Sequence, residues 1–414
     1  FIKAWGEMDE NLDLNRTPPS FGKLINLMPT SVRPVGGKAG RADLVAALQE
    51  HQKNIRVHQL DEQQIAFRDA LHPEGGVRSD DSALVQFYDR LRASTVPVYR
   101  RASWMDAGTA AAALRRFNDS AGPQRVIIGA WNHGGAQQSS PYQQDKAPIS
   151  PPHQVTRLDM LHFLKNAFYN PQDLPEHQLV YYTLGSETWQ TSATWPPVGV
   201  RCQRWYFSAE RSLSPSRPAE SGADRFSVDF RASSGIYNRW WELGVAKGQP
   251  VQYSDRGAQQ DYVLAYQSPP LEHDLEIAGS PVLTLQINSS LPDCAFFAYL
   301  EDVLPNGRIV CVTDGQLRAI HRKPLETDIA VGCGPPPHSF RMKDALPLIP
   351  GKVCEVRFAL LPVSVLFRAG HRVRIALAGH DDGNFPRVPV EGQPVWEIQR
   401  GSQHGSYLEL PVQP

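Results

Sequence analysis

One change of pattern along the chain constrains its fold more than any other feature. From Val96 to about residue 183, short apolar runs alternate with helical periodicity, as VPVYRRA, AGTAAAALRRFND, QRVIIGAW, VTRLDMLHFLKNAFY and QLVYYTL. This alternation predicts parallel strands joined by crossover helices. Beyond Trp195-Pro196-Pro197 the helical signal nearly vanishes, and many short β-rich runs separated by turn residues predict a β-sandwich or jelly roll.

The two ends of this pattern carry further local predictions. Residues 1–95 show helical periodicity in three pieces, RADLVAALQEH, LDEQQIAFRDALH and SDDSALVQFYDRLR, separated by proline and glycine clusters. In the β-rich part, Leu304-Pro305-Asn306-Gly307-Arg308 lies between two apolar runs and predicts a hairpin with an Asn-Gly turn. The serine- and proline-rich stretch over residues 212–223 is predicted to be a loop.

Charge and hydropathy exclude several classes of partner. A formal net charge of −1 gives no electrostatic reason to expect nucleic acid or an anionic membrane surface. No apolar stretch approaches the roughly 20 residues of a membrane span, and no signal peptide is recognisable. The chain begins with Phe1 instead of methionine, so the native N-terminus is not seen. A cytoplasmic location is favoured, with other compartments left open.

The cysteines point neither to zinc nor to a disulfide framework. Their number is odd, and they form no C-x-x-C pair. Buried free thiols are therefore expected for all five, namely Cys202, Cys294, Cys311, Cys333 and Cys354.

Asp106 and His133 are the candidate catalytic residues. They are 27 residues apart, and each follows an apolar, strand-like run. We predict that an imidazole nitrogen lies about 2.6 to 3.2 Å from a carboxylate oxygen, because parallel strands end at one edge of a sheet. In α/β-hydrolases the triad order is Ser, Asp, His, which puts the serine upstream. None of the 31 glycines begins a G-x-S tripeptide, so the chain lacks a nucleophile elbow.

Each candidate has a simpler structural interpretation. An isolated histidine after a strand is usually structural. Asp106 precedes an alanine-rich helical run and could be its N-cap. Asp119 is a rival acid, although it ends that helical run instead of following a strand.

Several motifs resemble the cocaine esterase and Xaa-Pro dipeptidyl-peptidase (CocE/NonD) group of serine hydrolases. Trp104-Met105-Asp106 is similar to the W-Y-D acid motif of that family, and Ile128 to Gly134 (IGAWNHG) is similar to its G-P-W-x-H histidine motif. Further similarity lies in the β-rich half, in Leu271 to Gly279, Ser289 to Asp302, Asp314-Gly315 with Arg318, Gly370-His371-Arg372 and Asn384-Phe385-Pro386.

The resemblance implies a partial α/β-hydrolase core, with a parallel sheet and a helical cap, followed by a C-terminal all-β jelly-roll domain. Residues 1–95 would be the cap or lid, 96–198 the last part of the core and 199–414 the jelly roll. The chain departs from the family at three places. Met105 replaces the tyrosine of W-Y-D, Arg101 and Ala102 replace the usual glycines, and the G-x-S-Y nucleophile is missing.

The same resemblance implies a serine hydrolase that transfers an acyl group from a small-molecule ester or amide to water without a cofactor. His133 would be the general base and Asp106 would orient it, with the serine on an N-terminal segment or a companion chain. The alternative is a non-catalytic fragment or jelly-roll binding module, since fold alone does not fix function. The oligomeric state, a homo-oligomer included, is left open.

Aromatic side chains are the candidates for substrate contact. Trp5, Phe296 and Phe297 could line an apolar acyl pocket. Core packing is the usual role of such residues. Phe296 and Phe297 are adjacent on a predicted strand, so we expect them to point to opposite faces.

Two further groups of polar residues have weaker support. The acidic residues Glu7, Asp9 and Glu10 could bind a substrate ammonium group, although a solvated loop is the simpler interpretation. His153 and His162 are nine residues apart with no third ligand at metal spacing, so the sequence predicts no metal site.

Overall fold

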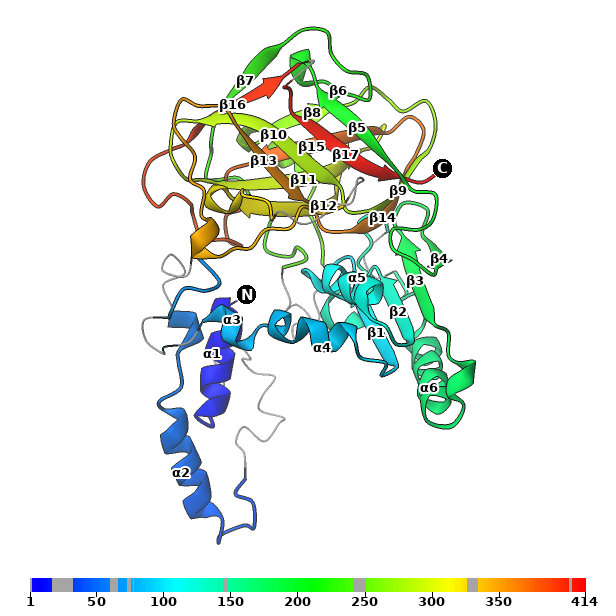
Figure 1. Ribbon diagram of the computed structural model, residues 1–414, viewed down its shortest axis with the longest axis vertical. Helices are drawn as coiled ribbons and strands as arrows, with labels where there is room; N and C mark the ends of the chain where they lie inside the picture. Colours follow the sequence, from blue (N-terminus) through cyan, green and yellow to red (C-terminus); the bar gives the residue numbers. More distant parts are fainter. Residues whose placement is uncertain are drawn as a thin grey trace. The chain divides into compact units, whose positions relative to one another are not determined.

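The computed structural model describes residues 2–16, 33–59, 66–72, 76, 78–143, 147–240, 251–325, 334–401 and 404–414 (Figure 1). The chain divides into two compact units, of which the first ends at Ala83 and the second begins at Leu84.

The first unit is helical. It contains α1 (Ile2–Asp13), α2 (Arg41–His51), a 3-10 turn over Val57–Gln59 and the one-turn helix α3 (Ser79–Ser82). The predicted helix LDEQQIAFRDALH is wrong where it can be compared, because residues 66–72 form turns and coil, while residues 60–65 lie outside the described part. The last predicted helix of this region is broken after Ser82, and a 3-10 turn (Leu84–Phe87) and α4 (Tyr88–Arg92) follow in the second unit.

The second unit opens with a four-stranded sheet. Its elements are β1 (Val98–Ser103), α5 (Thr109–Asp119), β2 (Gln124–Gly129), α6 (His153–Tyr169), β3 (His177–Thr183) and β4 (Thr188–Ser192). The strand order is β1-β2-β3-β4, with β1, β2 and β3 parallel. The predicted strand and helix alternation is confirmed. The antiparallel strand β4 was not predicted.

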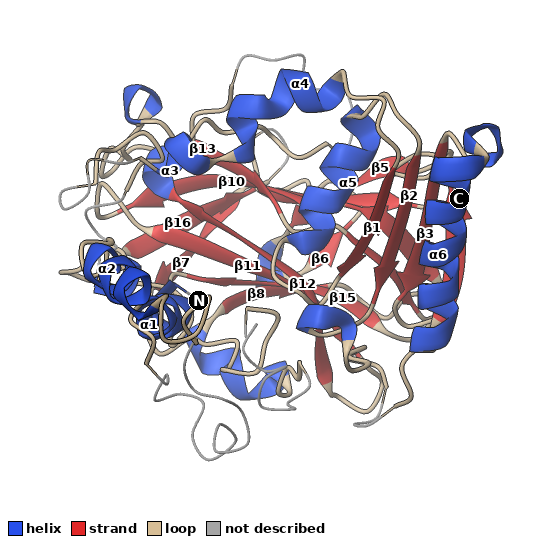
Figure 2. Cartoon of the chain, turned by 90° about the horizontal axis from the view of Figure 1, so that it is seen from below, coloured by secondary structure: helices blue, strands red, loops and turns tan. Residues whose placement is uncertain are grey.

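Two helices pack beside this sheet (Figure 2). Buried residues recur every three to four positions along α5 and so lie on one face of the helix. They are Ala110, Ala113, Leu114 and Phe117, and they share one core with strand residues such as Ile128. On α6, Phe163 meets the ring of Tyr99 from β1 at a centroid distance of 5.6 Å. The carboxylate of Asp159 accepts hydrogen bonds from Tyr99 and from Arg125 on β2.

The remainder of the second unit is built from two antiparallel sheets. The larger has nine strands in the order β14-β9-β17-β10-β16-β7, with β13 paired to β10, β5 to β17 and β6 to β5. Its strands are β5 (Arg201–Phe207), β6 (Leu213–Ser214), β7 (Gly222–Ser227), β9 (Leu275–Gly279), β10 (Val282–Ser289), β13 (Cys354–Ala359), β14 (Val363–Phe367), β16 (Val395–Arg400) and β17 (Tyr407–Val412). The smaller sheet has the order β12-β11-β15-β8, with β8 (Leu264–Gln267), β11 (Ala295–Val303), β12 (Ile309–Arg318) and β15 (Arg372–Ala378).

Side chains from both antiparallel sheets share one core. Phe296 of β11 lies 4.9 Å from Trp396 of β16, and Phe207 of β5 stacks on Tyr266 of β8 at 3.9 Å, measured between ring centroids. Aromatic pairs at these separations add packing energy beyond the area they bury. The two sheets are therefore packed face to face.

The β-rich part bears out one local prediction and corrects two. Between β11 and β12 the Leu304 amide donates to the Arg308 carbonyl over 2.9 Å and Gly307 has φ 86°, which confirms the hairpin. The predicted loop over residues 212–223 is wrong at both ends, where β6 and β7 form. The expectation of free thiols is wrong for Cys202, which is disulfide-bonded.

Within the described residues, we find no helix with both the length and the apolar composition that crossing a lipid bilayer requires.

Candidate active site

The register of β1 and β2 brings the two candidate residues to one edge of the sheet. The strands pair in parallel with Ser103 opposite Gly129, so they end at the same level. Asp106 follows the end of β1 by three residues, and His133 follows the end of β2 by four. This is the edge at which α/β sheets place their sites.

Asp106 and His133 are in direct contact. The imidazole Nδ1 of His133 lies 3.0 Å from Oδ1 of Asp106, within the predicted range. The Asp106 side chain is 10% exposed and that of His133 is 40% exposed. The predicted contact is confirmed. Because Nδ1 faces the carboxylate, Nε2 is the nitrogen left for another partner, and no described residue supplies one.

The alternative role of Asp106 as the N-cap of α5 does not fit the structure. Gly108 occupies the N-cap of α5, and that cap has no side-chain hydrogen bond. The backbone carbonyl of Asp106 accepts from the hydroxyl of Thr109 over 2.8 Å, which leaves its carboxylate to His133. The rival acid Asp119 accepts a hydrogen bond from Tyr88, and burial raises the pKa of its carboxyl.

The loop that carries Asp106 is held from several directions. Trp104 is buried and donates its indole N–H to the Tyr182 carbonyl over 2.6 Å. Ala107 has φ 41°, a left-handed conformation that is uncommon for a residue with a Cβ. Its amide donates to the carbonyl of Arg239 over 2.9 Å, so a segment of the β-rich part fixes this turn.

The loop that carries His133 depends on glycine and asparagine. Gly134 and Gly135 both have positive φ, 75° and 67°, which glycine adopts without a steric penalty. Asn132 accepts from the amides of Ala136 and Gln137 at its side-chain oxygen, over 3.0 and 2.9 Å. These bonds close the turn and hold the imidazole at its start.

The sequence did not predict a role for Ser103. Its side chain is buried, and its hydroxyl lies within hydrogen-bond distance of groups in both loops. A serine at a strand end carries no signal for such a contact, because the contact depends on the register of β1 against β2.

The aromatic candidates lie in packed regions. Phe296 is 1% exposed and belongs to the core between the antiparallel sheets. Phe297 is 5% exposed, points to the opposite face and meets Phe385 at a centroid distance of 5.1 Å. The expectation of opposite faces is confirmed, and the rings have the packing role weighed against substrate contact. Trp5 lies in α1, with its side chain outside the described part of the structure.

The three acidic candidates for binding an ammonium group lie on a helix of the first unit. Glu7, Asp9 and Glu10 lie on helix α1, so the solvated-loop interpretation is wrong. The carboxylate of Glu10 is held by Arg56 and His58, each over 3.1 Å, which occupies it within the unit. 

The two histidines weighed as metal ligands lie on one helix. His153 begins α6 and His162 lies within the same helix. Across the described ranges, no three His, Cys, Asp or Glu side chains gather in a group that could hold a metal ion.

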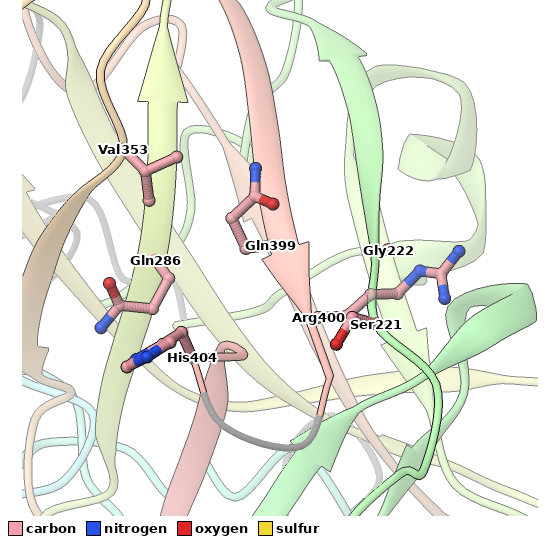
Figure 3. A pocket seen from close by; sticks show the side chains of 7 residues that line it. All are labelled: Ser221, Gly222, Gln286, Val353, Gln399, Arg400 and His404. Carbon is pink, nitrogen blue, oxygen red and sulfur yellow. The ribbon is translucent and has the colours of Figure 1, made fainter.

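A separate surface pocket lies on the larger antiparallel sheet (Figure 3). Its volume is about 550 Å³, and it contains neither Asp106 nor His133. Gln286 of β10 and Gln399 of β16 contribute side-chain amides to its lining. The residues that line it are Ser221, Gly222, Gln286, Val353, Gln399, Arg400 and His404.

Comparison with known proteins gives matches along the whole chain. A family described as the X-Pro dipeptidyl-peptidase C-terminal non-catalytic domain matches residues 173–409. A Mycobacterium bovis protein named "Putative serine esterase" is 35% identical over 441 residues, covering 100% of this chain and 68% of its own length. Cocaine esterase of Rhodococcus sp. is 22% identical over 360 residues, covering 79% of this chain and 58% of its own length.

Solved structures share the fold at low identity. A CocE/NonD family hydrolase from Staphylococcus aureus aligns with a TM-score of 0.56 and 15% identity, covering 77% of this chain and 54% of that one. An α-amino acid ester hydrolase aligns with a TM-score of 0.64 and 18% identity, covering 89% and 62%. This chain therefore spans between 54% and 68% of the length of these proteins.

Proposed function

The chain belongs to the cocaine esterase and Xaa-Pro dipeptidyl-peptidase (CocE/NonD) family of hydrolases, and from this premise we propose that it supplies the acid and base of a serine-hydrolase triad. The single observation that carries the proposal is the contact of 3.0 Å between His133 Nδ1 and Asp106 Oδ1. The buried carboxylate of Asp106 holds the imidazole of His133 at Nδ1. The other ring nitrogen, Nε2, has no hydrogen-bond partner among the described residues.

In this proposal Asp106 accepts a hydrogen bond from the Nδ1 proton, which selects the tautomer with a basic Nε2. His133 takes the proton of a serine hydroxyl as the serine oxygen attacks the carbonyl of a small-molecule ester or amide. The same proton passes to the leaving group, and an acyl-serine remains. Water then attacks the acyl-serine with His133 as base, which releases the acid and restores the serine. The reaction needs no cofactor.

The nucleophilic serine is proposed to lie on a segment outside these 414 residues. The chain contains no G-x-S tripeptide, and the relatives that it matches are longer. Among the described residues β1 pairs with β2 only, so one edge of the parallel sheet is open. A parallel sheet is normally buried on both sides and extended by further strands. We therefore propose that residues 96–198 are part of an α/β-hydrolase core, with 1–95 as its cap and 199–414 as a jelly roll.

Helix α6 supports a missing partner segment. It exposes apolar side chains that a soluble surface rarely gathers on one helix, with Leu158 at 66%, Leu161 at 57% and Phe168 at 77% exposure. The proposed occupant of this face is the segment of the same protein that carries the serine. A non-catalytic binding module, the alternative function, would give no reason for a partner segment with a nucleophile.

Labelling with a fluorophosphonate tests the proposal. The full-length protein is expected to react at one serine and to lose its activity on a p-nitrophenyl ester. Peptide mapping is expected to place the label outside the 414 residues, while the isolated chain stays unlabelled and inactive because it has no nucleophile to activate. A labelled serine within the chain, or an unreactive full-length protein, would contradict the proposal and favour the binding module.

The isolated chain is expected to self-associate. Its open strand edge and the apolar face of α6 would otherwise stay in contact with water. Replacing Leu161 and Phe168 together by lysine is expected to reduce the association, measured by light scattering during size-exclusion chromatography. The matched control replaces Val390 and Val35, two exposed valines outside the helices and strands, by lysine and should leave association unchanged. A monodisperse unmodified chain with a cooperative thermal transition would contradict the open-sheet proposal.

A further inference from the structure

The hydroxyl of Ser103 is a buried junction between the two loops of the candidate site. Ser103 is the last residue of β1 and is 2% exposed. Its Oγ lies 3.0 Å from the amide of Met105, the residue before Asp106. It also lies 2.8 Å from the amide and 2.5 Å from the carbonyl oxygen of Trp131, two residues before His133.

A serine hydroxyl can both donate and accept at this junction. A serine oxygen has one proton to donate and two lone pairs to accept with. Its one proton can be donated to the carbonyl of Trp131 in the histidine loop at 2.5 Å, and the carbonyl of Gly129, the last residue of β2, lies at 3.0 Å. It accepts from the amides of Met105 and Trp131. One side chain thus satisfies backbone groups of both loops in a region without exposed surface.

The position of this junction matters because the backbone ladder has already ended. The last backbone hydrogen bond between the two strands runs from the Trp104 amide to the Gly129 carbonyl, over 3.0 Å. Beyond it, in the described structure, the acid loop and the histidine loop are joined by the Ser103 hydroxyl and by the Asp106–His133 contact itself.

We propose that Ser103 is the positioning residue of this site, which sets the separation of Asp106 and His133 by tying the backbone beside each of them to one oxygen. The inference rests on the proposed function for its effect on catalysis. Its structural content, that the hydroxyl governs the His133–Asp106 hydrogen bond, holds independently of the reaction. Loss of the hydroxyl leaves two buried amides without their acceptor and frees the loops to separate.

The test is Ser103→Ala in the full-length protein, with two readouts. The kcat for a p-nitrophenyl ester is expected to fall about 10- to 100-fold with KM changed less than about threefold, since misplacement of catalytic groups by about 1 Å has effects of this size. The proton resonance of His133 Nδ1, assigned by its loss in His133→Ala, is expected to shift or broaden in Ser103→Ala.

A matched control is available in Ser139, which is also a buried serine, and whose hydroxyl has no hydrogen-bond partner among the described residues. Ser139→Ala is expected to leave both readouts unchanged. If Ser103→Ala fails to fold, Ser103→Thr, which keeps the hydroxyl, must retain the native resonance for the inference to stand. An unchanged resonance in folded Ser103→Ala overturns the inference. An inactive native protein whose resonance still responds to Ser103→Ala overturns the proposed function alone.

Discussion

Replacing His133 by alanine is expected to abolish hydrolysis by the full-length protein, with kcat reduced by about four orders of magnitude or more. In Ser-His-Asp hydrolases the three groups act as a unit, and removing the base leaves only the rate given by binding and the oxyanion site. Here the imidazole Nδ1 of His133 lies 3.0 Å from the carboxylate of Asp106, which is the contact that the proposed triad requires. The measurement is kcat and KM for a p-nitrophenyl ester.

The accompanying variants make this result specific. Asp106→Asn is expected to cost about 10⁴-fold in kcat, because an amide favours the wrong tautomer of the imidazole. His133→Ala and the double variant should show similar losses, as expected for members of one unit. His273→Ala removes an exposed histidine elsewhere on the chain and should change nothing. A His133→Ala protein that keeps its rate would rule out the triad.

The sequence predicts the candidate pair because both signals are local. An acid after one strand and a histidine after the next are visible in the pattern, and parallel pairing alone brings them together. The contacts around the pair are not local. Ser103 acts through register, and the carbonyl of Arg239 receives the Ala107 amide over 132 positions of sequence. A backbone carbonyl carries no side-chain signal, so no pattern could single it out.

The difference between local signals and contacts of distant segments also decides which strands the sequence predicts. Strands such as β10 and β11 are buried along nearly their whole length, and their sequences VLTLQINS and AFFAYLEDV are rich in aliphatic and aromatic residues, which the sequence reveals directly. The first two residues of β7 lie at the end of the serine- and proline-rich stretch that predicts a loop, and the strand GADRFS alternates between intermediate and exposed positions. It forms by pairing with β16, from Gly222 opposite Arg400 to Ser227 opposite Val395. Tertiary pairing overrides weak strand propensity at such an edge.

The β-rich part contributes to the candidate site through a buried ion pair. Arg239, whose carbonyl holds the Ala107 turn, has its guanidinium Nε 2.8 Å from Oδ1 of Asp314. The side chains are 1% and 6% exposed. Tyr253 and Trp240 complete the cluster, with the phenol oxygen 3.1 Å from Arg239 Nε and the indole N–H donating to Asp314 over 3.2 Å. The loop that carries Asp106 is therefore hydrogen-bonded to the backbone of Arg239, whose side chain forms an ion pair shielded from water.

Asp314→Asn is expected to lower the free energy of unfolding by about 3 to 5 kcal/mol, because it leaves the buried guanidinium of Arg239 without a counter-charge. The change preserves volume, so the loss reports charge and hydrogen bonding more than packing. The measurement is the urea midpoint followed by tryptophan fluorescence in the full-length protein. The control is Asp229→Asn, which breaks the pair with Arg231 at 2.7 Å, where the arginine is 74% exposed. Solvent screens that pair, and its loss should cost at most about 1 kcal/mol. Equal losses in the two variants would show that burial does not strengthen the Arg239–Asp314 pair.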